Sequence, residues 1–376
     1  MKIEQFVQKL RTGGAETVAT TYAITLNSYP MHTVEVVVYD GREEDTPNEE
    51  RLRKAGVKIF FASNRQRWYY KHNNIFAQMI RSLIRHAAII AHIYKEKPDV
   101  IHFNGTPIPV IKLIASVFPH IKLVYTIHSE LSNVFSNDDD IAVTKKLVAN
   151  NKLQMIALHS RMQQECNKLF GINSTVVINN GIDVDKIRAA KSCRAIYRAK
   201  LHYTDENFVI GHVGSMLPVK NHTFLLDVFD SVIHCVPEAR LLLVGSGELH
   251  EEVMGKAEKL GFRDKVTWLE KREDIPELLA AMDYFVFPSL YEGLPLSVLE
   301  AQAAGLPVLL SSAVTDEVMV TDHIYQMPLE CGADKWADEI IHPREYSHHD
   351  GLEMFNIKNV TERLLALYQE NSNEDF

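Results

Sequence analysis

The sequence predicts an α/β protein with two doubly wound domains, each built on a parallel sheet. Three observations support this fold class. Short apolar runs rich in β-branched residues recur along the chain. Segments with the three-and-four apolar spacing of helices separate them, and this alternation is typical of parallel sheets covered on both faces. The third observation is the length, because 376 residues suggest about two domains.

The expected strands fall into two series. The first comprises residues 33–39, 57–61, 100–103, 122–127, 154–158 and 175–178, and an apolar stripe over 76–90 predicts a helix within it. The second comprises residues 208–213, 240–244, 266–269, 284–287 and 308–311, with helices expected over 224–232 and 360–368. A polar segment, 183–206, separates the series. We therefore place the domains at 1–185 and 186–350, followed by a C-terminal helical segment, 351–376.

The composition excludes several classes of protein. Hydrophobic residues make up 46% of the chain and charged residues 24%, which is ordinary globular chemistry. The four cysteines form no CxxC pair, which suits a reducing compartment and does not support a zinc site. We find no signal peptide and no run of about 18 apolar residues. The expected location is cytoplasmic.

The charge is distributed unevenly. Residues 1–180 hold 22 Lys+Arg against 16 Asp+Glu, and the remainder holds 18 against 33. Residues 51–97 carry 11 basic side chains and one acid, together with Trp68, Tyr69 and Tyr70. Basic residues beside aromatics favour an anionic lipid surface, although a solvated helix face is the alternative. Nucleic acid is not expected, because no binding motif accompanies the basic stretch.

Ligands of open parallel sheets bind at the carboxyl ends of strands, so the loops there are candidate sites. Gly13 and Gly14 form the first such turn and allow a phosphate to approach the backbone, although a tight turn alone also requires glycine. Lys220 precedes a helix in the second domain, where it can neutralise a diphosphate or simply lie exposed. Gly245 starts a glycine turn that can line a nucleotide pocket or be purely structural.

The most specific pattern is the segment 287–301, which contains two glutamates eight residues apart. Glu292 precedes the expected helix and Glu300 lies within it, so both can address one ligand. Pro295 suits the first turn of that helix. Glu300 lies among apolar residues, where a carboxylate needs hydrogen-bond donors such as sugar or ribose hydroxyls.

Together these motifs resemble the family 4 retaining glycosyltransferases of bacterial exopolysaccharide and lipopolysaccharide synthesis. The matching segments, in family order, are residues 13–16, 99–102, 125–128, 180–183, 213–220, 244–247 and 292–300. The resemblance implies the GT-B fold, with two Rossmann-like domains facing a cleft. It also implies that the N-terminal domain binds the acceptor, the C-terminal domain binds the nucleotide-sugar, and the last helix returns to the N-terminal domain.

The resemblance further implies roles for individual residues. Three are expected to be catalytic: Lys220 stabilises the leaving diphosphate, Glu292 holds sugar hydroxyls, and His128 lies beside the donor sugar. For His128, a satisfied histidine at a strand end is the alternative. The expected donor-binding set is Gly13, Gly14, Lys220, Gly245, Arg272, Glu292, Gly293, Leu294 and Glu300.

One departure from the family pattern concerns charge. Many members have arginine directly after the Val-Gly of the second domain, whereas this chain has Ser215. Arg272 is a candidate substitute, and weak donor binding or lost activity are the alternatives. No metal or other cofactor is expected. The Asp-x-Asp runs at 138–140, in an expected loop over 136–140, and at 183–185 are interpreted as structural or solvated.

The predicted function is retaining transfer of a sugar from a nucleotide-diphosphate sugar, with a UDP-sugar favoured. The acceptor would be a glycan or a polyprenyl-linked sugar. Arg65, Arg67, Trp68 and Lys71 are expected to rest on the inner face of the membrane, making the enzyme peripheral. A non-catalytic nucleotide-sugar-binding or scaffold protein is the main alternative. A nucleotide-sugar epimerase is disfavoured by Lys220 and the two glutamates, and a periplasmic binding protein by the missing export signal.

Overall fold

The computed structural model describes residues 1–11, 14–40, 46–63, 75–270, 272–344 and 349–370, without the side chains of 75–77. The chain forms two compact units. Unit 1 comprises Met1–Gly181 together with Ile357–Phe376, and unit 2 comprises Ile182–Asn356. The sequence-based boundaries were 185/186 and 350/351. No helix among the described residues has the length and hydropathy of a membrane span.

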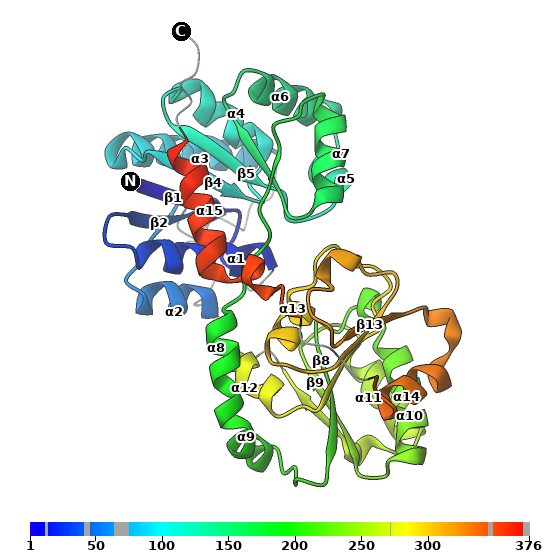
Figure 1. The fold of residues 1–376 in the computed structure, drawn as a ribbon. Coiled ribbons are helices and arrows are strands. Elements are labelled where there is room, and N and C mark those ends of the chain that lie inside the picture. Colours follow the sequence, from blue (N-terminus) through cyan, green and yellow to red (C-terminus); the bar gives the residue numbers. More distant parts are fainter. Residues whose placement is uncertain (12–13, 41–45, 64–74, 271, 345–348, 371–376) are drawn as a thin grey trace. The chain divides into compact units, whose positions relative to one another are not determined.

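Unit 1 alternates strands and helices (Figure 1). Its strands are β1 (Lys2–Val7), β2 (Thr33–Val38), β3 (Lys58–Phe61), β4 (Val100–Asn104), β5 (Lys122–Thr126), β6 (Gln154–Ala157) and β7 (Val176–Val177). Its helices are α1 (Gly14–Asn27), α2 (Pro47–Lys54), α3 (Ile75–Glu96), α4 (Ile108–Val117), α5 (Leu131–Val134), α6 (Asp138–Ala149), α7 (Ser160–Phe170) and α15 (Ile357–Gln369).

The seven strands of unit 1 form one parallel sheet in the order β3-β2-β1-β4-β5-β6-β7. The order reverses direction between β1 and β4, which is the switch point where such sheets bind ligands. Apolar side chains from the strands and covering helices form its core. Helix α15 follows unit 2 in sequence but packs beside α1 of unit 1.

Unit 2 repeats this architecture with six strands. They are β8 (Phe208–Val213), β9 (Ala239–Val244), β10 (Val266–Leu269), β11 (Tyr284–Phe287), β12 (Val308–Ser311) and β13 (Ile324–Met327). The helices are α8 (Val184–Ala189), α9 (Arg194–Lys200), α10 (His222–Cys235), α11 (His250–Lys259), α12 (Ile275–Ala280), α13 (Leu296–Ala303) and α14 (Ala333–Ile341). Short 3₁₀ turns occupy 190–193, 218–220, 263–265, 316–318, 329–331 and 352–355.

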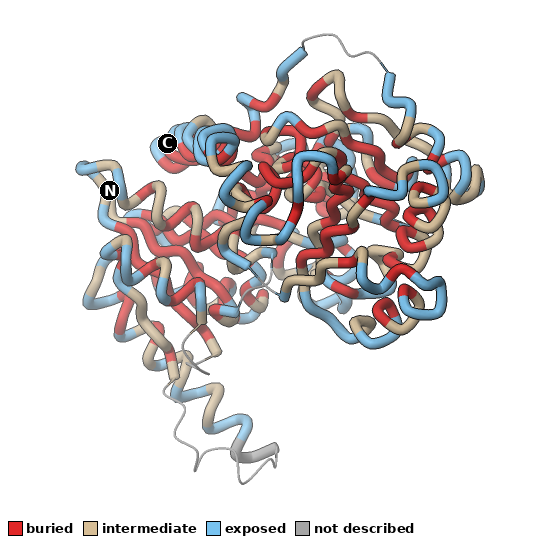
Figure 2. The backbone as a smooth tube through the Cα atoms, turned by 90° about the horizontal axis from the view of Figure 1, so that it is seen from below, coloured by how far each residue is buried: buried red, intermediate tan, exposed pale blue. Residues whose placement is uncertain are grey.

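The sheet of unit 2 is also parallel, in the order β10-β9-β8-β11-β12-β13. Its switch point lies between β8 and β11, so the loops after these strands are candidates for the ligand site. Two apolar clusters fill the two faces of the sheet. In both units the buried residues follow the strands, while exposed residues lie on the outer faces of helices (Figure 2).

The predicted α/β class and all eleven expected strands are confirmed, with small differences at their ends. Two strands were not predicted. In β1, Glu4 and Gln5 interrupt the apolar pattern although both are fully buried. Strand β13 is a short edge strand with mixed polarity. The loop expected over 136–140 was wrong, because Asp138 to Asp140 form the first turn of α6.

Asp138, Asp139 and Asp140 sit where carboxylates complement the helix dipole, and Asn137 caps the helix. The polar segment 183–206 is also more ordered than a linker. Asp183 caps α8 by accepting a hydrogen bond from the Lys186 N–H.

Candidate active site

The loops that follow β8 and β9 touch each other through their backbones. The Gly214 N–H donates to the Val244 carbonyl at 2.9 Å, and the Met216 N–H donates to the Ser246 carbonyl at 3.0 Å. Gly245 has φ of +145°, and a Cβ there would lie 2.0 Å from the Gly214 oxygen. Only glycine fits this close approach. The two loops therefore form one rigid surface at the carboxyl edge of the sheet.

The loop after β11 is hydrogen-bonded to the same surface. The Leu290 N–H donates to the Val219 carbonyl at 2.8 Å, and the Asn221 amide donates to the Pro288 carbonyl at 3.3 Å. Lys220 lies between these two bonded positions, at the end of a 3₁₀ turn directly before α10. Its backbone is thereby held on both sides.

Lys220 and Glu292 form an ion pair across these loops. The Lys220 Nζ lies 2.6 Å from the Glu292 Oε1, and the side chains are only 16% and 20% exposed. The ammonium also lies 4.7 Å from the centre of the Phe287 ring, within cation–π range. A Cβ on Gly214 would lie 2.9 Å from the His212 Nε2 and 3.4 Å from the Lys220 Cε, so a side chain there would crowd the histidine and touch the lysine. The pair can exchange partners with a ligand that carries both an anion and hydroxyl groups.

Two buried histidines lie near this lysine. The His212 Nδ1 donates to the Val286 carbonyl at 2.9 Å, and its ring centre lies 4.7 Å from that of His222. Burial, and then the charge of His222, holds the pKa of His212 well below its usual range. Burial, and then Lys220, lowers the pKa of His222 to about 4. Both rings are therefore neutral near pH 7, and the positive charge at this point belongs to Lys220.

Glu300 lies on α13, half-buried among apolar neighbours. Burial raises the pKa of its carboxyl to about 7, and the charge of Lys186 on α8 partly opposes this. We find no hydrogen bond to the Glu300 side chain in the part of the chain that the structure describes. The carboxylate thus has free acceptor capacity for hydroxyl donors.

In unit 1, His128 follows β5 and is held by a buried amide. Its Nε2 lies 2.9 Å from the Asn104 Oδ1, and the Asn104 amide donates to the Gln5 Oε1 at 2.9 Å. Burial lowers the pKa of His128 to about 4, so the ring is neutral. With its Nε2–H donating to Asn104, the Nδ1 is a hydrogen-bond acceptor, and it has no partner among the described residues.

The same network extends to α15. The Tyr368 hydroxyl lies 2.6 Å from the His102 Nδ1 and accepts from the Gln5 amide at 3.3 Å. The other nitrogen of His102 lies 2.7 Å from the Thr126 hydroxyl. Burial, followed by the charge of His128, lowers the pKa of His102 to about 3.

Asn104, Gln5 and Tyr368 were not predicted as site residues. The sequence contained a signal for Asn104 and Gln5, because an amide side chain inside an apolar strand requires a buried hydrogen-bond partner. The Tyr368 contact depends on α15 returning to unit 1, which places a residue 363 positions away from Gln5 beside it.

The remaining predicted residues are placed as follows. Gly14 begins α1 and is exposed. Gly293 and Leu294 are half-buried in the loop of Glu292. Arg272 donates through two nitrogens to Asp274, at 2.7 and 2.6 Å, and its side chain is 43% exposed. Its role as a substitute for the missing arginine stays a prediction.

Five predicted residues lie outside the described part of the chain. They are Gly13 of the first glycine turn and the membrane-contacting set Arg65, Arg67, Trp68 and Lys71.

Two doubly wound units, with candidate ligand groups on strand-end loops, define the class of two-domain sugar-nucleotide folds called GT-B. Two family models match the chain, one mainly in unit 1 and one within unit 2. The model described as "Glycosyltransferase Family 4" matches residues 12–186, and the model described as "Glycosyl transferases group 1" matches residues 207–342. The chain therefore belongs to glycosyltransferase family 4.

Curated relatives agree with this assignment. The chain is 28% identical over 249 residues to an Escherichia coli UDP-Gal:alpha-D-GlcNAc-diphosphoundecaprenol alpha-1,3-galactosyltransferase, covering 61% of this chain and 63% of the relative. It is 35% identical over 161 residues to the putative glycosyltransferase EpsF of Bacillus subtilis, covering 42% and 39%. The chain thus spans less than two thirds of the length of these relatives.

Solved structures share the whole fold. The Anabaena protein HepE, crystallised with UDP and glucose, matches with a TM-score of 0.77 at 21% identity, covering 99% of this chain and 100% of that one. WaaG, a glycosyltransferase involved in lipopolysaccharide biosynthesis, matches with a TM-score of 0.66 at 16% identity, covering 99% and 100%. These likenesses confirm the predicted GT-B fold.

Proposed function

We propose that the protein is a retaining hexosyltransferase that uses a nucleotide-diphosphate sugar, with a UDP-sugar favoured. The observation that carries the proposal is the Lys220–Glu292 pair on the fastened loops of unit 2. Lys220 offers a fixed positive charge to a leaving diphosphate, and Glu292 offers an acceptor to sugar hydroxyls. Glu300, whose carboxylate accepts no hydrogen bond from any described residue, suits the ribose hydroxyls.

The chemistry follows from the placement of charge. The bond from the anomeric carbon to the diphosphate oxygen breaks, and negative charge develops on the diphosphate. A cation already in place stabilises that charge without reorganisation, which lowers the barrier. The N–H groups at the start of α1, near Gly14, add a second anion-binding element. In this proposal Lys220 supplies the charge at the donor site, and no metal is required there.

The configuration at the anomeric carbon is retained if the acceptor attacks from the face that the diphosphate leaves. The acceptor hydroxyl then forms the new bond to the anomeric carbon, and its proton passes to the departing diphosphate oxygen. His128 contributes a neutral acceptor, its Nδ1, toward a sugar hydroxyl. Exclusion of water during this step limits hydrolysis of the donor.

The proposed acceptor is a glycan or a lipid-linked sugar of surface polysaccharide synthesis, reached at the membrane. The E. coli relative acts on a diphosphoundecaprenol-linked acceptor by its name. In this chain α3 exposes Met79, Ile80, Leu83 and Ile84, which are 41 to 66% exposed. Exposed apolar side chains on a helix that follows the basic segment 65–71 support a peripheral membrane contact.

The membrane contact is tested by sedimentation with vesicles that contain phosphatidylglycerol. The wild-type chain should sediment at low salt. Replacing Arg65, Arg67 and Lys71 with Ala, or Leu83 with Gln, should each reduce the bound fraction. The exposed Lys259→Ala on α11 of unit 2 is the control and should leave it unchanged. Absence of sedimentation at low salt would remove the membrane part of the proposal.

The donor is tested by a thermal-shift panel with UDP, GDP, ADP and their sugar conjugates, with and without EDTA. A ligand that binds the folded state raises the melting temperature. We expect a shift with a uridine nucleotide that EDTA does not change in size, and its loss in Lys220→Ala. The transfer of labelled sugar to a polyprenyl-diphosphate sugar then tests catalysis.

The exposed Ser215 favours a second candidate, a nucleotide-sugar-binding protein without turnover. A thermal shift with no transfer to any acceptor would select it.

A further inference from the structure

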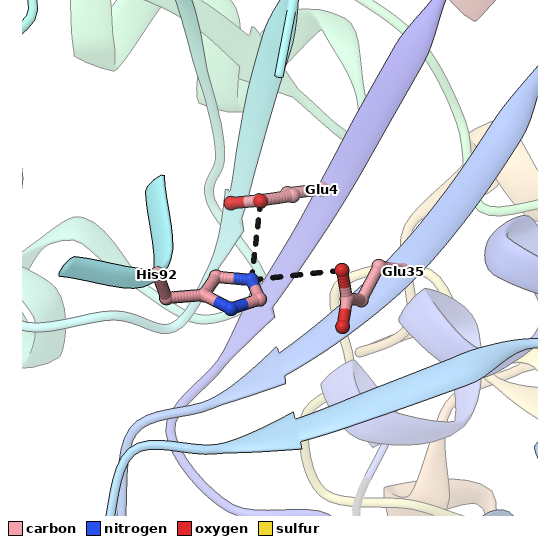
Figure 3. A group of neighbouring side chains, drawn as sticks. All are labelled: Glu4, Glu35 and His92. Atoms are coloured by element: carbon pink, nitrogen blue, oxygen red, sulfur yellow. Dashed lines mark ion pairs between the residues drawn. The ribbon is translucent and has the colours of Figure 1, made fainter. Parts of the chain in front are cut away.

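A second polar group lies inside unit 1, on the body of the sheet rather than on its strand-end loops. Glu4 on β1 and Glu35 on β2 are register partners in neighbouring parallel strands, so they share a face of the sheet. His92 on α3 covers that face. Figure 3 shows the three side chains, from three different elements, pointing toward one another.

The three side chains are close and almost fully buried. The His92 Nε2 lies 3.3 Å from the Glu4 Oε1 and 3.5 Å from the Glu35 Oε2. Their exposed fractions are 0% for Glu4 and 8% for the other two. One ligand atom from each residue falls within 4.8 Å of the others.

The group is not satisfied by hydrogen bonds. Both carboxylate oxygens of Glu4 and the His92 Nε2 are buried without a hydrogen-bond partner among the described residues. Such groups are rare because burying them unpaired costs free energy. A protonated His92 would place one positive charge against two carboxylates, at distances longer than a normal N–H···O bond. The arrangement therefore calls for a cation that all three side chains can reach.

Neighbouring charges do not supply that cation. Lys2 at the start of β1 and Lys95 near the end of α3 both pair with Glu96. The face of the sheet thus gathers more negative than positive charge.

We propose that Glu4, Glu35 and His92 bind a divalent metal ion, Zn²⁺ by preference. Zinc binds His nitrogen and Glu oxygen at about 2.0–2.2 Å, so ligand atoms in a tetrahedral site lie about 3.3–3.5 Å apart. The two measured separations match that spacing. Glu4 can complete the coordination through its second oxygen, which is also unpartnered.

The site is separate from the proposed donor chemistry. Glu4 lies three residues before the end of β1 at Val7, so it does not face the strand-end loops. The ion would join β1, β2 and α3. It would therefore hold the C-terminal half of α3 on the sheet, while the N-terminal half of α3 carries the exposed apolar residues. The inference stands whether or not the protein transfers sugar.

The test measures zinc in the full chain, purified without an affinity tag. After incubation with ZnCl₂ and gel filtration, we expect about one zinc per chain by mass spectrometry. EDTA should lower the melting temperature by about 5 °C or more, and ZnCl₂ should restore it. CoCl₂ in place of zinc should give the visible absorption of tetrahedral Co²⁺.

Variants locate the ion. Glu4→Gln and His92→Asn should each lose the bound zinc and the EDTA effect. His86→Asn is the matched control, because His86 lies on the same helix but contacts Tyr39 instead. It should keep one zinc.

If the variants fail to fold, the number of zinc ions per wild-type chain and the absorption spectrum of the cobalt-loaded chain still test the proposal. Less than a tenth of an equivalent in the ZnCl₂-treated wild-type chain would overturn the proposal. Equal zinc in all variants would overturn it as well.

Discussion

The buried polar network of unit 1 and the charged loop pair of unit 2 differ in how their polar groups are bonded. In unit 1, Gln5, His102, Asn104 and Tyr368 bond to one another, and the histidines are held neutral by burial. In unit 2, Lys220 and Glu292 carry charge and are bonded mainly to each other. The same sheet architecture thus yields a neutral, internally satisfied edge in one unit and a charged edge in the other.

The difference follows from where the residues lie. Three of the unit 1 groups, Gln5, His102 and Asn104, are on strands, and Tyr368 is on α15; inside the fold a buried polar atom must find a partner. The unit 2 groups are on loops and partly reach solvent, so their charge survives. The charged edge is the one suited to a diphosphate, and the neutral edge is suited to holding one side chain, His128, in a fixed orientation.

The strongest test of this contrast removes the charge of unit 2. Lys220→Ala should lower kcat/KM for a UDP-sugar by about 10³-fold, because a fixed group that stabilises developing charge contributes on that scale. Lys256→Ala is the matched control, since Lys256 is also a partly buried lysine of unit 2 but pairs with Asp227 at 2.6 Å. Steady-state kinetics measure both. A variant that retains a tenth of the activity would show that the charge lies elsewhere.

The second test concerns the rigidity of the charged edge. Gly245→Ala should destabilise the fold by about 3 kcal/mol or more, because its Cβ would overlap the Gly214 oxygen. Gly255→Ala in α11 has open space around the new Cβ and should instead stabilise by about 0.5–1 kcal/mol. Urea unfolding measures both. Similar stabilities for the two variants would contradict the backbone contact.

The third test uses pH on the charged edge. The pKa of Glu300 rises on folding from 4.5 to about 7, so the folded state holds the proton more tightly. Stability therefore falls as pH rises through that window. Glu300→Gln removes the carboxyl group, so its stability should not fall over this pH range. Its free energy of unfolding should exceed that of wild type by about 2 kcal/mol at pH 8 and should not exceed it below pH 4.5. Unfolding at several pH values measures this.

Glu258→Gln on the exposed surface of α11 is the control for that experiment and should show no pH-dependent gain. If the Glu300 variant gains equally at all pH values, buried charge is not the cause.

The fourth test removes the hydrogen bond that orients His128 in unit 1. Asn104→Ala removes the acceptor of the His128 Nε2–H and should lower kcat about tenfold, through misorientation of the ring. The thermal shift caused by UDP should stay the same. Asn27→Ala, on α1 and outside the network, should leave kcat unchanged. An equal loss of kcat in both variants would point to a general structural effect.

The smallest effect is expected from adding charge. Ser215→Arg supplies a second cation beside the diphosphate position and should tighten UDP binding about fivefold. Ser215→Gln adds length without charge and serves as its control. Calorimetry measures both. Weaker binding in the arginine variant would mean that this loop already holds its ligand by other contacts.

Much of the fold was predictable because apolar β-branched runs mark parallel strands directly. Strand β1 was not predicted because Glu4 and Gln5 interrupt its apolar pattern. Both are buried against polar side chains of other elements, and the apolar spacing of the sequence cannot show such contacts. The Lys220–Glu292 contact was not predictable from spacing, since it joins loops 72 residues apart through the sheet order. The hydrogen bond between Asn104 and His128 likewise depends on β4 and β5 being neighbours.

The return of α15 to unit 1 has a consequence for biosynthesis. Tyr368 completes the bonding of Gln5 and His102, yet it is translated only after all of unit 2. During synthesis, the Gln5 amide and the His102 Nδ1 lack the Tyr368 hydroxyl until unit 2 has been translated, although Gln5 can already bond to Asn104 and His102 to Thr126. The hydrogen-bond network of unit 1 is therefore completed only after unit 2 has been translated.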